Sequence, residues 1–158
     1  MKIIFLDIDG VLNSARTQET FRDYVFVSDD KVMLLKELVE QTDAKIVLSS
    51  SWREGWALKD KYPKCRHVDV ELYEALCDKL AQYDLKLFDY TGKGRMRGLE
   101  IDEWLKREHD EKIESFVILD DMDETDFWPH SSHLVQTDIS KGLTKKCVEM
   151  AIKKLNEN

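Results

Sequence analysis

Three short runs of mostly apolar residues, each followed at once by polar side chains, constrain the fold of this chain most strongly. They are residues 2–6 (KIIFL), 44–48 (AKIVL) and 115–119 (SFVIL). An apolar run that does not alternate with polar residues is typical of a parallel strand buried on both faces of a sheet. We therefore predict three central strands, with a short fourth strand at 134–136.

Segments with the helical spacing of apolar residues lie between these strands. The predicted helices are a first at about 29–41, a short one before Pro63, and three more at about 70–82, 98–109 and 142–156, with a further strand at 85–88. Strands that alternate with helices indicate an α/β fold with a Rossmann-like parallel sheet sandwiched by helices. Its ligand site is expected at the carboxyl ends of the strands.

Length and charge narrow the class of protein. With 158 residues, the chain is expected to form a single domain over 1–158, with a small insertion at about 54–92. A net charge of −8 argues against sequence-blind binding of nucleic acid through the whole surface, but it is compatible with a local basic site. The N-terminal apolar run is too short for a signal peptide or a membrane span, so a cytoplasmic location without a membrane partner is expected.

Polar residues gather where the three central strands end. The first strand leads into Asp7-Ile8-Asp9-Gly10, the second into residues 49–53 (SSSWR), and the third into 120–126 (DDMDETD), where five of seven residues are acidic. The carboxyl ends of parallel strands meet at one edge of a sheet. Crowded carboxylates repel one another unless a cation neutralises them, so the pattern indicates a hard divalent ion, Mg²⁺ before Ca²⁺.

Each of these polar segments also has a simpler interpretation. Asp-x-Asp-Gly can form an ordinary turn, and an acidic run is often a solvated loop. Any one serine of residues 49–51 can be part of a turn or a helix cap. Their joint position at one sheet edge favours a functional site over three unrelated loops.

Residues 5–12 (FLDIDGVL) resemble the first signature of the haloacid dehalogenase superfamily. Most members of that superfamily are Mg²⁺-dependent phosphatases and phosphotransferases that work through an aspartyl-phosphate. Val47-Leu48-Ser49-Ser50 is similar to the second signature, and residues 117–121 (VILDD), with Asp126 five positions on, are similar to the fourth. The resemblance therefore spans most of the chain and implies the fold and the metal already indicated.

The third signature of the superfamily is a lone lysine or arginine. Lys93, Arg95 and Arg97 are candidates, and Arg97 is favoured because it begins a predicted helix at the usual distance before the acidic strand end. Within the superfamily, the combination of Asp-Gly-Val-Leu-Asn, Ser-Ser-Trp-Arg and a helix with Trp104 resembles the small domains found in multi-enzyme RNA-repair proteins.

The resemblance implies roles for the residues at the strand ends. Phosphoryl transfer needs a nucleophile, a proton for the leaving group and charge neutralisation at the phosphoryl oxygens. Asp7 would attack phosphorus, and Asp9 would protonate the leaving oxygen and then activate water. Mg²⁺ would be held by the Asp7 carboxylate, the Asp9 backbone carbonyl and an acid of the fourth signature. Asp121 would be the direct ligand with Asp120 behind it, or the reverse.

Further residues would contact the phosphorylated substrate. Ser50, or else Ser49, would hydrogen-bond a phosphoryl oxygen, and Arg97 would supply a fixed positive charge beside it. Arg53 would either clamp the substrate phosphate or cap a helix at the surface.

The spacing of the signatures bears on the size of the substrate. About 40 residues separate the first two, enough for a linker, one helix and a short flap but not for a large cap domain. An open site favours substrates that are too large to be enclosed, namely RNA or DNA ends, phosphoproteins, or phosphate groups on a larger partner. Residues 92–98 (GKGRMRG), with Lys93 and Arg95, would either guide a phosphodiester strand or form an ordinary exposed loop.

Two alternatives to a nucleic-acid phosphatase are open at this point. A small-molecule phosphomonoesterase, such as a nucleotidase, would need a lid that the chain barely provides. A catalytically silent binding module would keep the fold without the reaction, which the intact Asp7, Asp9 and paired acids argue against.

Overall fold

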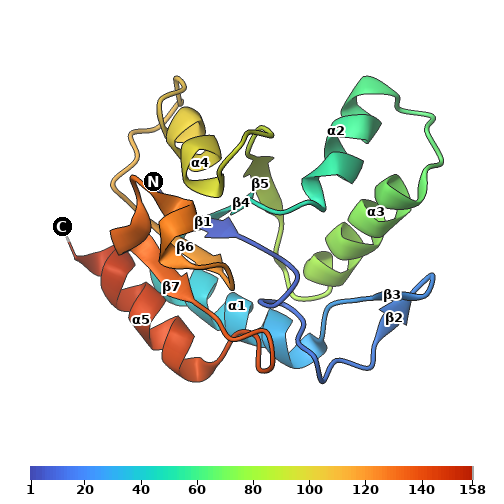
Figure 1. The fold of residues 1–158 in the computed structure, drawn as a ribbon, viewed down its shortest axis with the longest axis horizontal. Coiled ribbons are helices and arrows are strands. Elements are labelled where there is room, and N and C mark those ends of the chain that lie inside the picture. The colour runs from blue at the N-terminus through green and yellow to red at the C-terminus, as the bar shows by residue number, and fades with distance from the viewer. Residues whose placement is uncertain (158) are drawn as a thin grey trace.

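The centre of the molecule is a five-stranded sheet in which all neighbouring strands run parallel (Figure 1). The structure is a computed structural model that describes residues 1–157. In the order β5-β4-β1-β6-β7, the strands are Leu87–Tyr90, Lys45–Leu48, Lys2–Leu6, Ser115–Asp120 and Leu134–Gln136. The three predicted central strands are confirmed, and they lie side by side in the middle of the sheet.

Helices cover both faces of this sheet. One face packs against α1 (Asp29–Thr42), α3 (Val68–Ala81) and α5 (Lys145–Asn156). The other packs against α4 (Arg97–Leu105) and the 3₁₀ helix η1 (Glu124–Phe127). The remaining helix, α2 (Arg53–Lys61), packs on α3, and a second 3₁₀ helix, η2, spans Ser131–His133. The predicted α/β, Rossmann-like sandwich is confirmed, and residues 1–157 form no large cap domain.

The two faces of the sheet have separate hydrophobic cores, because neighbouring residues of a strand point to opposite sides. In β1, Ile4 and Leu6 belong to the core on the α1 and α5 side. Ile3 and Phe5 belong to the core on the α4 side, where the Phe5 ring lies 5.3 Å from the Trp104 ring, edge to face. All four strand side chains are fully buried, which explains why the apolar run is continuous.

The position of the β5 strand differs from the prediction, which placed it at 85–88 instead of Leu87–Tyr90. Leu85 is buried, but its N–H donates to the Leu80 carbonyl (3.0 Å) directly after Asp84, whose φ is 58°. These contacts are typical of a helix C-terminus that closes with a left-handed residue. The apolar Leu85 therefore belongs to the end of α3 and not to the strand.

Helix α4 is shorter than predicted, since it ends at Leu105 and not near His109. The chain turns after the helix, and the His109 ring lies 4.3 Å from the Trp104 ring. His109 Nε2 is also 3.0 Å from the Trp104 carbonyl oxygen, which accepts the Arg107 N–H (3.2 Å) as well. The histidine thus packs against the end of the helix instead of extending it.

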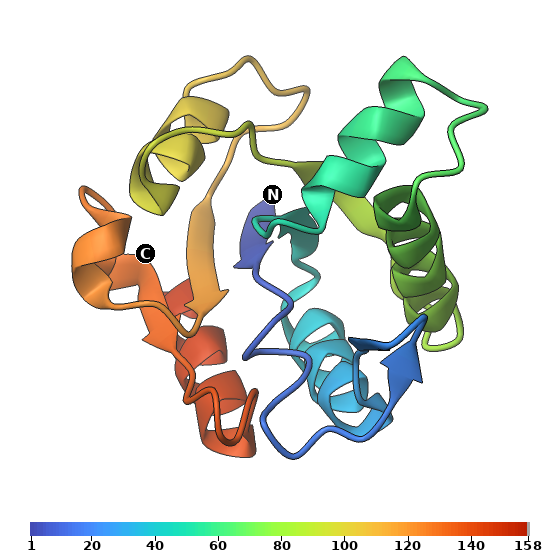
Figure 2. The same ribbon diagram turned by 45° about the vertical axis from the view of Figure 1, so that its right-hand side comes forward.

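The short flap predicted between the first two signatures is a β-hairpin of β2 (Thr20–Phe21) and β3 (Tyr24–Val25). Its turn residues Arg22 and Asp23 have positive φ values of 49° and 66°, as in a tight two-residue hairpin turn. The hairpin lies beside α3 (Figures 1 and 2), and Arg22 Nε is 3.0 Å from Glu71 Oε2. The hairpin and the α2–α3 segment therefore form one side of the molecule.

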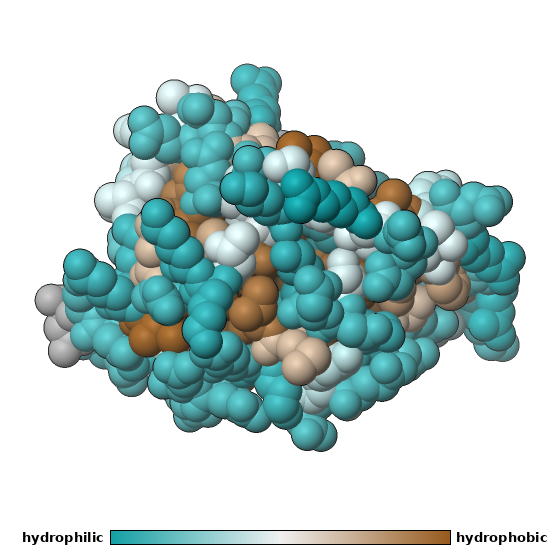
Figure 3. All heavy atoms as spheres, turned by 90° about the horizontal axis from the view of Figure 1, so that it is seen from below, coloured by the Kyte–Doolittle hydropathy of each residue, from teal (hydrophilic) through white to brown (hydrophobic). Residues whose placement is uncertain are grey.

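Figure 3 shows the face of the molecule that lies at the bottom of Figure 1. Hydrophilic side chains cover most of this face, and hydrophobic side chains form small separate areas on it (Figure 3). Within residues 1–157, every helix is too short or too polar to cross a membrane.

Candidate active site

The polar segments at the ends of β1, β4 and β6 meet at one edge of the sheet, because the strand pairing continues past the strand ends. The Asp7 N–H donates to the Leu119 carbonyl (3.0 Å), and the Ser49 N–H donates to the Leu6 carbonyl (2.8 Å). Leu6 of β1 is opposite Leu119 of β6, so the next residues, Asp7 and Asp120, are neighbours. Parallel pairing alone thus joins the first and fourth signatures.

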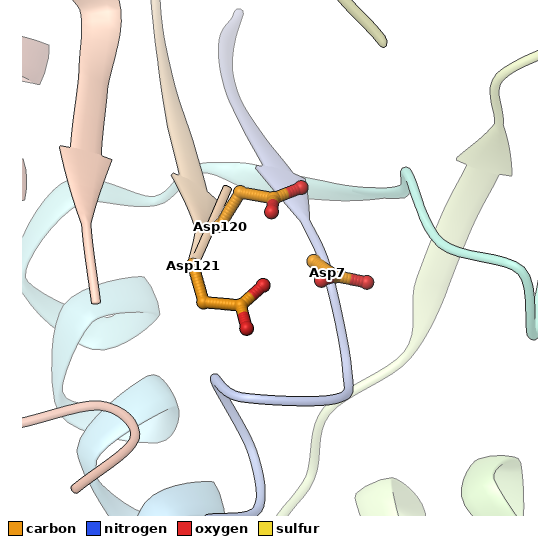
Figure 4. Close-up of side chains that lie close together, drawn as sticks. All are labelled: Asp7, Asp120 and Asp121. Atoms are coloured by element: carbon orange, nitrogen blue, oxygen red, sulfur yellow. The ribbon is translucent and has the colours of Figure 1, made fainter. Parts of the chain in front are cut away.

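Three carboxyl groups form a cluster at this edge. Asp7, Asp120 and Asp121 each place one carboxylate oxygen within 4.8 Å of the others. Figure 4 shows Asp120 and Asp121 reaching from the end of β6 toward β1, where Asp7 lies. Asp7 is 7% exposed and Asp120 only 1% exposed, whereas Asp121 is half-buried. The sequence-based expectation that these acids converge therefore agrees with their positions.

Burial changes the protonation of the cluster. It raises the pKa of the Asp7 carboxyl from 3.8 to about 6, even though the Arg97 charge and hydrogen bonds from the Ile8 amide and Ser50 act in the opposite direction. Burial, followed by the charge of Asp7, raises the pKa of Asp120 to about 8. Without a cation, the cluster therefore retains a proton near neutral pH, because burial removes the water that would stabilise the ionised carboxylates.

The cluster has the features of a site for a hard divalent cation. Asp120 Oδ1 accepts a hydrogen bond from the Met122 N–H (3.0 Å), but the buried Asp120 Oδ2 has no hydrogen-bond partner among the described residues. An unpaired buried carboxylate oxygen is costly unless a cation binds it. The three residues offer only oxygen atoms, which Mg²⁺ prefers. The donor set therefore fits Mg²⁺.

Gly10 allows Asp121 to approach the loop after β1. Its φ is +80°, a conformation that side chains with a Cβ rarely adopt. A Cβ at this position would lie 2.4 Å from Asp121 Oδ2. The glycine of the first signature thus serves both the turn of the chain and the placement of a carboxylate.

Replacing Asp120 with asparagine is expected to stabilise the metal-free protein at neutral pH and to weaken Mg²⁺ binding. The folded protein holds protons on Asp7 and Asp120 that the unfolded chain releases near pH 4, so folding stability falls as the pH rises from about 4 to about 8. Asp120→Asn removes the group with the more strongly raised pKa. In thermal unfolding with EDTA, its unfolding temperature should fall less between pH 6 and pH 8 than that of the wild type.

The exposed Asp110 provides the matched control, because Asp110→Asn should keep the wild-type pH dependence. His133, whose pKa is lowered by burial, acts in the opposite sense but equally in all these proteins. Mg²⁺ should stabilise the wild type more at pH 8 than at pH 6, since it competes with protons, and should stabilise Asp120→Asn less. If the unfolding temperatures of Asp120→Asn and the wild type fell equally between pH 6 and pH 8, the prediction would be contradicted.

Asp9 lies apart from the acid cluster and is exposed. The Asn13 amide donates to Asp9 Oδ1 (2.9 Å), and the Trp52 indole N–H donates to Asp9 Oδ2 (3.1 Å). Asn13 Oδ1 in turn accepts the Gly10 N–H (2.9 Å), which fixes the loop between them. The sequence analysis did not predict that Asn13 and Trp52 would bind Asp9. The only sequence signal for these two residues is that both belong to the segments that resemble the RNA-repair domains.

The two candidate serines differ in their surroundings. Ser50 hydrogen-bonds to Asp7 and thereby lowers its pKa, and Ser50 Oγ also accepts the Trp52 N–H (3.3 Å). Ser49 Oγ is buried and has no hydrogen-bond partner among the described residues. The structure therefore brings Ser50 to the acid cluster, as the preferred alternative expected.

Two arginines and a glutamate form a buried network beside the acids. Arg97, at the start of α4, has its Nε 3.9 Å from Asp120 Oδ2 and its Nη1 3.6 Å from Glu100 Oε2. Arg53 Nη2 is 3.1 Å from Glu100 Oε1, and its Nη1 donates to the Ser50 carbonyl (3.1 Å). The side chains of Arg53 and Glu100 are 7% and 6% exposed.

This network corrects one expectation and adds one residue. Arg53 is not a surface residue that caps a helix, because its side chain is buried and binds Glu100 and the Ser50 carbonyl. Sequence analysis missed Glu100, for which the only signal is its position three residues after Arg97 on the same helix. Arg53 and Glu100 together fix the surroundings of Ser50 and Arg97.

Lys93 and Arg95 lie on the exposed loop between β5 and α4, and among the described residues neither forms an ion pair or hydrogen bond with the acid cluster. Lys93 Nζ is 3.2 Å from Glu54 Oε1 on α2. The Gly94 N–H donates to Glu100 Oε1 (2.8 Å), so the buried network holds the middle of this basic loop.

The fold and the site define a Rossmann-like α/β protein with an acidic, cation-compatible centre at the carboxyl edge of its sheet. The model of the family described as "HAD domain in Swiss Army Knife RNA repair proteins" matches residues 3–148, and the chain belongs to this family. Comparison with curated proteins and with solved structures found no match. Family membership confirms the predicted resemblance and indicates a phosphatase-type function.

Proposed function

We propose that this protein is a Mg²⁺-dependent phosphatase that removes the terminal phosphate of a nucleic-acid strand through an aspartyl-phosphate on Asp7. The observation that carries the proposal is the cluster of Asp7, Asp120 and Asp121 at the carboxyl edge of the sheet, with Arg97 beside it. The family description, which names RNA repair, supports the substrate class.

Mg²⁺ would be held by the carboxylates of Asp7, Asp120 and Asp121 and by the Asp9 backbone carbonyl. When bound, the cation would supply positive charge that neutralises these acids and the phosphoryl oxygens. The unpaired Asp120 Oδ2 supports this assignment, since it is buried beside Asp7 without a donor. Asp120 and Asp121 both remain candidates for direct ligation.

The chain offers a group for each proton and bond of the reaction. A carboxylate oxygen of Asp7 forms a bond to phosphorus while the bond from phosphorus to the leaving oxygen breaks, and Asp9 gives its proton to that oxygen. Asp9 then takes a proton from water, which attacks phosphorus and releases Asp7 and inorganic phosphate. Ser50 and Arg97 donate to the phosphoryl oxygens, on which negative charge is concentrated.

The open edge of the site supports a large substrate. The hairpin and the α2–α3 segment stand on one side of the sheet edge (Figure 2), and residues 1–157 provide no large cap over the acids. Exposed Lys93 and Arg95 lie on the loop that leads into α4 and Arg97. These two cations would bind the phosphodiester groups next to the terminal phosphate.

The proposal is tested by measuring Mg²⁺-dependent phosphate release from a panel of phosphoesters. The panel contains 3′- and 5′-phosphorylated oligonucleotides, mononucleotides, sugar phosphates and an aryl phosphate. We expect one class of oligonucleotide end to have the highest kcat/KM. If only the small esters react, the proposal of a nucleic-acid substrate is wrong. If no phosphoester reacts, the proposal of a phosphatase is wrong.

Replacing Trp52 with phenylalanine is expected to lower kcat about tenfold on every substrate of the panel. The variant keeps a ring that packs against Phe26 but loses the N–H that donates to Asp9 Oδ2. Loss of a hydrogen bond costs about 0.5–1.5 kcal/mol, and Asp9 would then be held by Asn13 alone. The readout is kcat together with its pH profile.

Trp128 provides the control for this substitution, because it is 63% exposed and lies after η1. Trp128→Phe should keep the wild-type kcat and pH profile. If Trp52→Phe also kept both, the indole N–H would have no part in positioning Asp9.

A further inference from the structure

An open cavity of about 320 Å³ lies between the hairpin and the α2–α3 segment, and Asp9 is part of its lining. Tyr24 and Val25 of the hairpin, Trp52 before α2 and Leu72 of α3 provide its aromatic and apolar surface. Its volume is at the lower end of the ~300–1,000 Å³ of small-molecule sites. One flat ring system therefore fits it better than a folded segment of another protein.

The cavity is joined to the reacting centre through Asp9. The Trp52 side chain that lines the cavity donates its indole N–H to Asp9 Oδ2 (3.1 Å). In the proposed function, Asp9 protonates the leaving oxygen. A group bound in this cavity is therefore attached to the leaving oxygen, on the nucleoside side of the phosphoester and not on the phosphoryl side.

The hairpin side chains that line the cavity are exposed. Tyr24 is 51% exposed and Val25 is 48% exposed, so the hairpin presents an aromatic and a branched side chain without burying them in a core. The Trp52 ring packs near Phe26, with 6.1 Å between the two ring centres. Aromatic side chains in such positions stack nucleobases, whatever the base, because every base has a π face.

The polar groups of the cavity select among the bases. Glu54 and Asp69 add carboxylates to the lining, and carboxylates only accept hydrogen bonds when ionised. They repel a second phosphate but accept from the amino groups of guanine, adenine and cytosine. Guanine offers two adjacent donors to one carboxylate, whereas uracil and thymine offer a single N–H between two carbonyls.

We infer that this cavity binds the nucleobase next to the terminal phosphate, stacked on Trp52 and Tyr24, and that it prefers a base with an amino group, guanine above all. The inference rests on the proposed function, whose site it extends. Glu54 also holds Lys93 (3.2 Å), so the basic loop lies beside the cavity and places a cation near the sugar-phosphate chain that leaves it.

The test uses oligonucleotides of one sequence that carry the phosphate on the reactive end and differ only in the terminal residue: guanine, adenine, cytosine, uracil or an abasic sugar. We expect kcat/KM for the guanine end to exceed that for the abasic end and that for the uracil end by about tenfold or more. Equal values for guanine and abasic ends would overturn the inference, while the phosphatase proposal would stand.

Two substitutions, each with a matched control, assign the effect to the cavity. Tyr24→Ala should reduce the ratio of guanine to abasic kcat/KM about tenfold, whereas Tyr62→Ala, which changes a tyrosine of similar exposure outside the cavity, should not change it. Glu54→Gln should reduce the ratio of guanine to uracil, whereas Glu74→Gln, at another lysine-paired glutamate, should not. If Tyr24→Ala and Glu54→Gln left these kcat/KM ratios as unchanged as their controls do, the inference would be overturned.

A binding measurement separates this inference from catalysis. In EDTA, guanosine monophosphate should quench the tryptophan fluorescence of the wild type more than uridine monophosphate does, and ribose phosphate should not quench it. Trp52→Phe should lose most of the quenching. Absence of phosphate release with this quenching present would refute the phosphatase alone, and absence of quenching by every nucleotide would refute the cavity as a base site.

Discussion

Replacing Asp7 with asparagine is expected to lower Mg²⁺-dependent phosphate release by at least about 10³-fold and to leave the fold intact. The neutral amide is a poor nucleophile and cannot form the aspartyl-phosphate. Asparagine has almost the same shape, and Asp7 is a buried carboxyl whose pKa is raised to about 6, so losing its charge should not destabilise the metal-free protein. The measurement is phosphate release from the best substrate, with circular dichroism to establish the fold.

The control is again Asp110→Asn, which changes an exposed aspartate and should keep wild-type activity. An independent measurement supports the assignment: wild-type protein stopped with acid during turnover should carry a phosphoryl group on Asp7 that hydroxylamine removes. Activity of Asp7→Asn within tenfold of the wild type would rule out Asp7 as the nucleophile.

Replacing Glu100 with alanine is expected to lower the free energy of unfolding by about 3–5 kcal/mol. Glu100 is the carboxylate that faces both Arg53 (3.1 Å) and Arg97 (3.6 Å), and its side chain is only 6% exposed. Its removal leaves two guanidinium groups close together without this counter-charge, and it also removes the acceptor of the Gly94 N–H. Urea unfolding in EDTA measures the change.

Glu103, an exposed glutamate of the same helix, provides the comparison. Glu103→Ala should change stability by less than about 0.5 kcal/mol. Glu100→Gln should lie between the two, since its amide oxygen still accepts the Gly94 N–H but carries no charge. A loss below about 1 kcal/mol for Glu100→Ala would mean that Asp7 and Asp120 compensate the arginines by themselves.

The strands and helices could be predicted where their pattern depends on residues close together in the chain. The β1 and β6 runs are apolar on both faces, and acids follow at their ends. Both the strands and the positions where they end could therefore be predicted from the sequence. The β5 boundary was wrong because Leu85 is apolar for a different reason: it closes α3 through Leu80. A strand residue and a buried helix end look alike in sequence.

The candidate site was predictable in part. Asp7, Asp120 and Asp121 lie together because parallel pairing in register is a regular consequence of the fold. Glu100 was not predictable, since a glutamate after an arginine on a helix is usually a solvated ion pair. It is buried here because α4 packs on the sheet while Arg53 of α2 approaches from another segment.

The sequence by itself determined the parallel sheet and the acids at its carboxyl edge, because hydrophobic periodicity is a local property and the fold brings strand ends together in a regular way. Only the tertiary structure decided that Asn13 and Trp52 hold Asp9, that Glu100 joins two arginines, and that a cavity opens beside Asp9. These features depend on distances between side chains of separate segments, which are set by the packing of whole helices and of the hairpin.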